Sequence, residues 1–445
     1  MSDPLCAPSS KPSVTPFQAN FALGVFLLAY ILSFVDRQIL SLLVDPIKRD
    51  LGVSDLQMGL LQGFAFALLY AFLGVPVGLL ADRAVRKRII AAGVVFWSIA
   101  TALCGFAGNY ALLFAARMGV GMGEATLSPS AHSFLSDAFE PAKLARAMAI
   151  YSMGITLGGG MAYLIGGSVV AAVASADTTH LPLIGALRPW QMAFVIVAAP
   201  GILVAALVAM VKEPARRSLV GATQDVVRPS LGAVLRYLAS QWRAFVPIYL
   251  TSSVLGILGY SLSSWFPTLL IRNYHLSPGT AGLYMGGIYL VLGSAGSICG
   301  GLLSERIAKR GRPEANLLTV GLVSVASLIP AIAAPLVGVF WATLMLFGLL
   351  TFFFNGFFGS SIAAVQLATP NTMRATNSAL FLLINNLFGL SLGAAAVPVI
   401  NAVLFSGSQN VGPAIALIAL VCCPISAALA FWGLRPYRKL LLRKD

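Results

Sequence analysis

The sequence contains few charged residues for its length. Asp, Glu, Lys and Arg together make up 10% of its 445 residues, whereas hydrophobic residues make up 58%. A soluble domain is typically about 25% charged, and a chain of this size would need far more charge than this to cover its surface in water. The exterior must therefore face an apolar medium, which predicts an integral membrane protein.

The sequence also has few of the residues from which metal sites and disulfide frameworks are built. It contains three histidines and five cysteines, and no two cysteines have C-x-x-C spacing. This composition predicts no metal and no cofactor. The alternating glycines of residues 119–123 look like part of a dinucleotide fingerprint, but they lie in a long apolar run with no strand before them. We therefore expect that the protein is not an enzyme.

Long apolar runs are what the sequence has in abundance. A membrane-crossing helix needs about 20 mostly apolar residues, and twelve segments meet this requirement. They are residues 17–43, 54–80, 89–107, 110–135, 145–173, 190–211, 244–270, 278–303, 316–335, 338–364, 376–404 and 412–433. The predicted fold is an all-α integral membrane protein with twelve transmembrane helices.

The net charge of +14 comes from basic residues that cluster between the apolar runs. If both termini are cytoplasmic, 23 of the 29 Lys and Arg residues lie in cytoplasmic segments and 4 lie in external loops. Basic residues favour the cytoplasmic side of a membrane. The distribution therefore predicts cytoplasmic termini, and it argues against nucleic acid as a partner.

The chain divides into two halves that partly repeat each other. A polar linker, residues 212–243, separates six spans in residues 17–211 from six spans in residues 244–433, and residues 1–16 and 434–445 form cytoplasmic tails. Gly78-Leu-Leu-Ala-Asp82-Arg83 follows the second span, and Gly301-Leu-Leu-Ser-Glu305-Arg306 follows the eighth, 223 residues later. Duplicated halves are typical of transporters with a site at the interface between them. We expect two pseudo-symmetric six-helix bundles.

The motif after the second span resembles the signature of the major facilitator superfamily, G-x-x-x-D-R-x-G-R-R. Gly78, Asp82, Arg83, Arg86 and Lys87 match it, and Val85 replaces its glycine. Arg117-x-x-x-Gly121-x-Gly123-Glu124 in the fourth span is similar to a second superfamily motif, which usually ends in a small residue. The resemblance extends over essentially the whole chain.

Two short motifs are most similar to the spinster family, the lysolipid and sphingolipid-type transporters and their bacterial relatives. They are Val35-Asp36-Arg37 in the first span and the segment from Arg117 to Thr126 in the fourth. The resemblance implies the major facilitator fold and a transport function. It also implies a multi-pass protein of the bacterial inner (plasma) membrane.

Four full charges lie well inside the predicted spans: Asp36, Arg37, Arg117 and Glu124. A charge within a membrane is costly and is by default a sign of function. Arg117 and Glu124 are two helical turns apart and therefore share a face, and the resemblance implies that spans one and four line the transport path. We predict that Glu124, with Asp36 as second choice, carries a proton, and that Arg37 and then Arg117 bind an anionic headgroup. A static ion network that pins the two spans together is the alternative.

The second half offers an apolar counterpart to these charges. A shift of 223 residues from the four charges reaches Gly259, Tyr260, Phe340 and Phe347, and span ten adds a run of phenylalanines. An anionic head and an apolar body would suit a cavity with one charged and one aromatic wall. The residues predicted to bind substrate there are Tyr260, Phe347, Phe354, Asn355 and Asn385.

The resemblance also implies a gate at the cytoplasmic ends of the helices. Asp82 would meet the start of span eleven, around residues 371–376, and Glu305 would meet span five, around residues 141–145. A helix N-terminus favours a nearby anion, so both contacts would close the cytoplasmic side. Arg83, Arg86 and Arg306 complete the predicted gating set.

The function predicted from these residues is proton-coupled transport of an amphipathic organic anion, such as a lysophospholipid or a sphingolipid-like molecule, by alternating access. The partners would be this substrate, protons and membrane lipids, and the protein is expected to be a monomer. A multidrug antiporter or a sugar-acid symporter of the same fold remains an alternative, because fold alone does not define substrate. A proton-independent lipid flippase is the alternative of another class.

Overall fold

The structure, a computed structural model, describes residues 14–81, 83–174, 179–181, 185–216, 231–370, 373–406 and 409–442. Several predicted features therefore lie outside the described residues. They are residues 1–13 of the first tail, Asp82, residues 217–230 of the linker and the last three residues.

The first half of the chain is helical apart from one short hairpin. Its helices are α1 (Pro16–Leu42), α2 (Val44–Leu51), α3 (Asp55–Gln62), α4 (Phe64–Ala81), α5 (Arg86–Gly105), α6 (Tyr110–Glu124), α7 (Leu127–Ala138), α8 (Pro141–Ser152), α9 (Gly154–Ala174), α10 (Pro189–Ala198) and α11 (Pro200–Met210). The hairpin consists of β1 (Thr179–Leu181), which pairs antiparallel with β2 (Gly185–Leu187).

The second half repeats this helical plan. Its helices are α12 (Leu231–Ser240), α13 (Trp242–Tyr274), α14 (Pro278–Ile288), the π-helical turn η1 (Tyr289–Gly293), α15 (Ser294–Lys309), α16 (Ala315–Ala333), α17 (Phe340–Ala368), α18 (Arg374–Leu404) and α19 (Gly412–Leu442). The last helix continues nine residues beyond the predicted end of span twelve, into what was predicted to be the C-terminal tail.

Polar side chains mark where several of these helices begin. Thr15 and Gln18 form a reciprocal capping box at the start of α1, and Ser54 and Gln57 form another at the start of α3. Such caps supply partners for backbone N–H groups that a helix leaves free. Within the spans, helical hydrogen bonding satisfies the backbone, as an apolar surrounding requires.

In the described part of the chain, eleven helical stretches are long and apolar enough to cross a membrane. The remaining predicted span, the fourth (residues 110–135), is divided into α6 and α7. Pro129 accounts for this break, because it has no N–H to donate to the carbonyl of Ala125 and its ring would collide with that carbonyl. Together α6 and α7 supply the twelfth crossing, which agrees with the predicted fold class of twelve transmembrane helices in two bundles.

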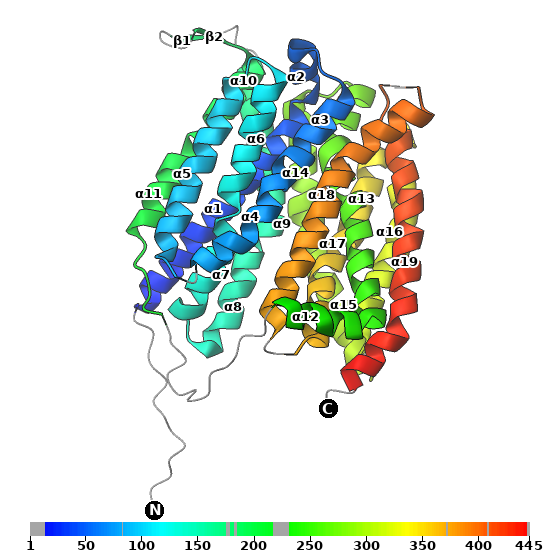
Figure 1. Cartoon of the computed structure of the whole chain (residues 1–445). Helices are drawn as coiled ribbons and strands as arrows, with labels where there is room; N and C mark the ends of the chain where they lie inside the picture. Colours follow the sequence, from blue (N-terminus) through cyan, green and yellow to red (C-terminus); the bar gives the residue numbers. More distant parts are fainter. Residues whose placement is uncertain are drawn as a thin grey trace, which may run out of the picture.

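The two halves stand side by side (Figure 1). Helices α1 to α11 pack largely among themselves, as do α13 to α19. Because α1 begins and α19 ends at the same side of the molecule, we call this side the terminal face. The far side, where α2 and the hairpin lie, is called the opposite face.

Glycines allow the halves to approach closely. A Cβ on Gly59 would lie 2.6 Å from the carbonyl oxygen of Ala394, and one on Gly63 would lie 2.4 Å from that of Leu390. Gly167 and Gly282 make a similar backbone contact between α9 and α14. These crossings lie in the parts of the helices nearer the opposite face, so the structure is closed on that side.

This packing predicts the effect of a larger residue at Gly63. Gly63→Val should destabilise the closed arrangement, since a Cβ has no room beside the Leu390 carbonyl, and should favour a state in which the opposite face is open. Spin labels at Arg49→Cys and Gln409→Cys in a cysteine-free background would report a longer distance. Gly74→Val on α4 is the control, because nothing lies within 4 Å of a Cβ there. An unchanged distance distribution in Gly63→Val would contradict the prediction.

Candidate functional site

Two helices of the first half bring the four intramembrane charges together. Asp36 and Arg37 are consecutive residues of α1, and Arg117 and Glu124 lie two turns apart on α6. Arg37 reaches Glu124, and Arg117 reaches the backbone of Asp36. Each cation of the cluster therefore makes a bond to the facing helix, so the charges also join α1 to α6.

Arg37 and Glu124 form the only direct ion pair within this cluster of four charges. The Nε and Nη2 atoms of Arg37 lie 2.6 Å and 2.5 Å from the same carboxylate oxygen, Oε2 of Glu124. The Glu124 side chain is fully buried, whereas the Arg37 side chain is 18% exposed. The arginine is therefore the more accessible member of the pair.

Arg117 and Asp36 lie deeper within the first half. Both residues are 1% exposed, and Nη1 of Arg117 donates to the backbone carbonyl of Asp36 at 2.9 Å. Oδ1 of Asp36, Nε of Arg117 and Oε1 of Glu124 are buried without a hydrogen-bond partner among the described residues. Buried polar atoms with unused bonding capacity are costly. The cluster can therefore exchange partners when one of its groups changes charge.

An aromatic cradle holds the Arg37 guanidinium. Its Cζ atom lies 4.6 Å from the ring centre of Phe66, 5.0 Å from that of Tyr70 and 5.2 Å from that of Phe34. A cation over an aromatic face gains favourable electrostatic energy, and more so where water is excluded. The rings keep the cation in place without satisfying its N–H groups, which remain able to bind an anion.

The motif glycines explain how α6 reaches this position. A Cβ on Gly121 would lie 2.3 Å from the backbone carbonyl of Phe66 on α4, and one on Gly123 would lie 2.7 Å from the side chain of Trp97 on α5. Only glycine permits these approaches. The helix then ends at Glu124 because of the break before Pro129, so the carboxylate stands at a helix terminus.

The second half supplies a less charged wall, but the structure does not bring all of its predicted residues to one place. Tyr260 is half-buried, and its hydroxyl donates to Oδ1 of Asn386 at 3.2 Å. Phe354 is also half-buried and packs on Phe357, and Asn355 donates to the carbonyl of Thr351 on its own helix. Phe347 and Asn385 are 1% and 4% exposed in this conformation. Their predicted contact with substrate remains a prediction.

His132 has partners that sequence reasoning did not find. Its ring packs edge-on against Tyr151 of α8, with ring centres 5.2 Å apart. Tyr151 in turn stacks on Tyr30 of α1, one turn before Phe34. The contact of Tyr30, Tyr151 and His132 could not be predicted from the sequence, because tyrosines within an apolar run form no recognisable pattern.

The predicted gating residues occupy different surroundings at the terminal face. Arg83 is exposed, and Asp82 lies outside the described residues. Arg86 is buried within the first half, where it pairs with Asp137 and Glu213. It therefore ties α5 to α7 and to the segment after α11 in this conformation.

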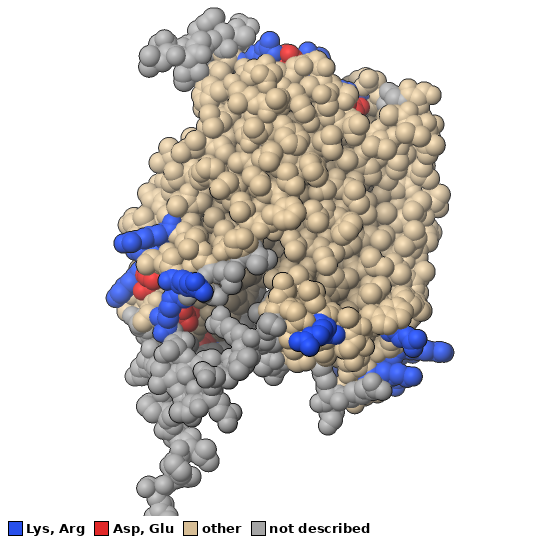
Figure 2. Space-filling model, viewed as in Figure 1, with Lys and Arg blue, Asp and Glu red and all other residues tan. Residues whose placement is uncertain are grey.

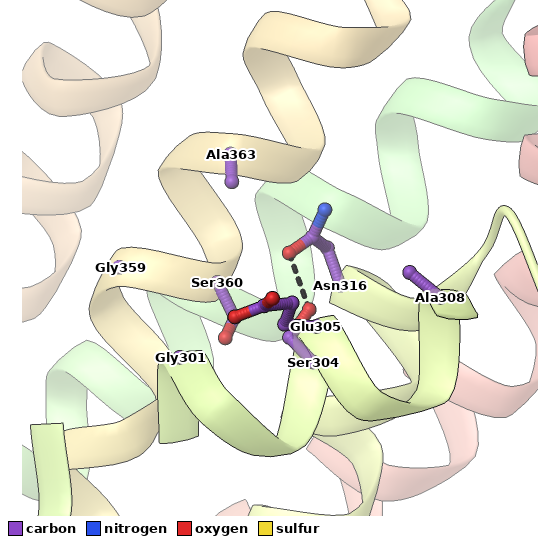
Figure 3. A pocket seen from close by; sticks show the side chains of 8 residues that line it. All are labelled: Gly301, Ser304, Glu305, Ala308, Asn316, Gly359, Ser360 and Ala363. Carbon is purple, nitrogen blue, oxygen red and sulfur yellow. Dashed lines mark hydrogen bonds between the residues drawn. The ribbon is translucent and has the colours of Figure 1, made fainter. Parts of the chain in front are cut away.

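Glu305 and Arg306 are exposed at the end of α15. The Glu305 carboxylate lies 2.5 Å from Lys309, one turn further along the helix. Glu305 also borders a pocket of about 330 Å³ between α15, α16 and α17, where Ser304 donates to Asn316 at 2.6 Å (Figure 3). This pocket belongs to the second half alone. The latch predicted between Glu305 and residues 141–145 would form in the other conformation, and it remains a prediction.

An ion cluster at the opposite face was not foreseen and joins the two halves. Arg272, near the end of α13, contacts Asp45 of α2 at 2.7 Å and Asp55 of α3 at 2.9 Å. Lys48 also contacts Asp55, at 2.6 Å. The Arg272 side chain is only 8% exposed. The predicted spans leave Asp45, Lys48 and Arg272 in external loops and place Asp55 at the start of the second span, but they gave no sign that residues more than 200 positions apart would meet.

The part of the chain that the structure describes contains no group of three or more His, Cys, Asp or Glu side chains placed to hold a metal ion. The site consists of charged, aromatic and amide groups. Such a set can bind an ionic molecule and exchange a proton.

Comparison with known proteins supports a transport role for this arrangement. The family model described as Major Facilitator Superfamily matches residues 26–394. An "MFS-type efflux pump" of Mycolicibacterium smegmatis is 30% identical, over 94% of this chain and 92% of that protein. "Protein spinster homolog 1" of Xenopus laevis is 28% identical, over 67% of this chain and 57% of that protein.

A solved structure also resembles the whole chain. It is the crystal structure of a bacterial homologue of the human lysosomal transporter Spinster, in an inward-facing and unoccupied conformation. It superposes with a TM-score of 0.79 at 25% sequence identity and covers 97% of this chain and 99% of that chain. The predicted resemblance to the superfamily, and within it to the spinster family, is thus confirmed.

The ion cluster predicts that Arg272 holds the opposite face closed. Truncating one partner of a buried, hydrogen-bonded charge pair costs about 2–5 kcal/mol. Arg272→Gln should therefore raise the population with an open opposite face by roughly tenfold or more. The same pair of spin labels would measure it.

Arg188→Gln is the matched control for this experiment. Arg188 pairs with Asp50 at 3.4 Å, and both residues belong to the first half. Its loss should leave the distance between the halves unchanged. Equal shifts in the two variants, or none in Arg272→Gln, would show that the cluster is not a gate.

Proposed function

Since the chain belongs to the Major Facilitator Superfamily, we propose that it is a secondary transporter that couples proton movement to the movement of an amphipathic organic anion. A lysophospholipid or a sphingolipid-like molecule is the substrate class that fits best. The likeness to spinster proteins supports this choice, as does the contrast between the charged first half and the aromatic second half.

The proposed location is the inner (plasma) membrane of a bacterium, with the terminal face in the cytoplasm. The excess of Lys and Arg in the segments assigned to that side supports this orientation. In this orientation the described conformation is closed to the outside. The likeness to an inward-facing solved structure agrees with this interpretation.

One observation carries the proposal: Arg37 is held by a fully buried carboxylate, yet its own side chain is partly exposed. Its two nitrogens are engaged by a single oxygen of Glu124, while part of the side chain is exposed. If Glu124 gains a proton, the carboxylate loses its charge and most of its hold on Arg37. The guanidinium then becomes available to a substrate anion.

The reverse step follows from the same geometry. When Glu124 loses its proton, its carboxylate again competes for Arg37, and the substrate anion loses its partner. A carboxylate and a substrate anion thus take turns on one arginine. Arg117 and Asp36 lie behind this pair, where Asp36 offers a second carboxylate for the proton.

The second half would receive the apolar part of the substrate. Tyr260 and Asn386 form a hydrogen-bonded pair on half-buried helix surfaces, and the ring of Phe354 lies beside Gly259, where a Cβ would be 2.9 Å from the ring. An apolar pocket with a few placed polar groups is the usual form of a site for small organic ligands.

Alternating access would require the two ends of the molecule to open in turn. Opening of the opposite face would break the contacts of Arg272 with Asp45 and Asp55. Closure of the terminal face would form the latches proposed for Asp82 and Glu305. Both conformations would then have their own ion pairs, so that neither is excessively stable.

Glu124→Gln tests the coupling. The variant mimics the protonated acid, so proton flux that accompanies a lysophospholipid into dye-loaded proteoliposomes should fall to background. Exchange of labelled for unlabelled substrate should persist, because it needs no net change in protonation. Glu140→Gln is the control, since Glu140 is an exposed acid that pairs with Lys143. Normal proton flux in Glu124→Gln would refute the proposed role.

Arg37→Lys tests the anion site. Lysine keeps the charge but loses the planar fork that engages Glu124 and the aromatic rings together. Affinity for a lysophospholipid should fall about tenfold or more, while a neutral lipid analogue should bind the variant and the wild type equally. A loss of affinity for both ligands would indicate a structural defect and would contradict headgroup binding.

The likeness to the efflux pump of Mycolicibacterium smegmatis favours a second candidate substrate class. A multidrug antiporter would expel cationic drugs in exchange for protons, using the same carboxylates as binding groups. Proton flux with cationic drugs and none with lysophospholipids would support this candidate. Lipid movement without any pH dependence would instead indicate a flippase.

A further inference from the structure

A groove runs along the outer surface of the first half, between α5 and α11. Its volume is about 590 Å³, and every residue that lines it is apolar. The α5 side is formed by Ala91, Ala92, Val95, Phe96 and Ile99, and the α11 side by Ile202, Ala205, Ala206 and Ala209. Alanines occupy much of its lining, so the groove is an open, apolar recess that a hydrocarbon chain can contact.

Basic residues gather at the end of this groove that lies at the terminal face. The Lys87 ammonium donates to the carbonyls of Ala209 and Val211, at 3.2 Å and 2.9 Å, and so stands at the end of the groove. Arg88 lies in the first turn of α5, and Lys212 lies just after the end of α11. Both residues are exposed. Figure 2 shows Lys and Arg side chains clustered where α5 begins and α11 ends.

The nearby acid does not neutralise these cations. Glu213 is engaged by Arg86, at 2.7 Å from Nε, and accepts the backbone N–H of Lys87 at 3.0 Å. Arg88 and Lys212 form no ion pair with any residue in the described ranges. The end of the groove therefore presents two exposed cations that no acid among the described residues pairs with.

We propose that this groove binds one anionic phospholipid from the leaflet at the terminal face. An acyl chain would lie along the apolar recess, and the phosphate would meet Arg88 and Lys212. Basic residues near a membrane surface each attract anionic lipid by about 1 kcal/mol. A lipid with a net negative headgroup is the one occupant that satisfies both ends of the groove.

A second copy of the chain fits the groove less well. In a symmetric dimer the same surface meets itself, so the cations at the groove end of one copy would approach those of the other. Repulsion between like charges would oppose that contact. The groove is also separate from the cluster around Arg37, because it lies on the outside of α5 and α11, and the inference does not depend on the proposed function.

Native mass spectrometry of the full chain in detergent tests the proposal. Dioleoyl phosphatidylglycerol should form a one-lipid adduct at about tenfold lower concentration than dioleoyl phosphatidylcholine. The double variant Arg88→Gln, Lys212→Gln should lose this preference. The matched control is Arg310→Gln, Arg312→Gln, which removes two exposed cations of the same face away from the groove and should keep the preference.

A second variant tests the recess without changing any charge. Ala92→Phe should fill the groove and weaken the phosphatidylglycerol adduct, whereas Leu103→Phe, at an exposed position of α5 outside the groove, should not. Equal binding of the two lipids, or a preference lost equally in both double variants, would overturn the proposal. A lipid-free dimer that disappears in Ala92→Phe would overturn it as well, since it would assign the groove to a second copy.

Discussion

The structure of the first half depends on a single ion pair held in an apolar surrounding. Arg37 and Glu124 bond at 2.5–2.6 Å within a bundle whose exterior faces lipid. A lone charge at such a depth would be costly, by about 2.5–3.5 kcal/mol on membrane-insertion scales. The two residues therefore stabilise each other and fix α1 against α6. If either residue loses its charge, the charge of the other must be neutralised by a third group. This requirement is the physical basis for coupling a proton to a bound anion.

Other features of the fold serve this pair. Glycines on α6 bring the helix against Phe66 and Trp97, the break before Pro129 ends the helix at Glu124, and three aromatic rings support the guanidinium. The second half contributes amide and aromatic groups to the predicted site but, among those residues, no full charge. At the opposite face, Arg272 joins the halves through two carboxylates in this closed conformation. The charges of the site and those that join the halves at the opposite face thus form two separate ion clusters.

Much of the fold could be predicted from the sequence. Apolar runs located the spans, because a membrane requires about 20 apolar residues for each crossing. The isolated charges within them are four residues that the structure brings together, and their role in transport remains a prediction. Helix breaks were less predictable, since Pro129 interrupts span four whereas Pro76, Pro247 and Pro267 remain inside helices. The ring contacts among Tyr30, Tyr151 and His132 could not be predicted, because no sequence pattern indicates them. The cluster of Arg272 with Asp45 and Asp55 depends on how two halves dock, which a single sequence does not encode as a local signal.

The central claim is that a carboxylate and a substrate anion compete for Arg37. Calorimetric titration of a bound lysophospholipid, repeated in buffers of different ionisation enthalpy, measures this most directly because it counts protons taken up on binding. The account predicts uptake of about one proton for each substrate bound by the wild type, and none for Glu124→Gln. Substrate binding by the wild type without any proton uptake would contradict it, and would leave the ion pair as a structural link between α1 and α6.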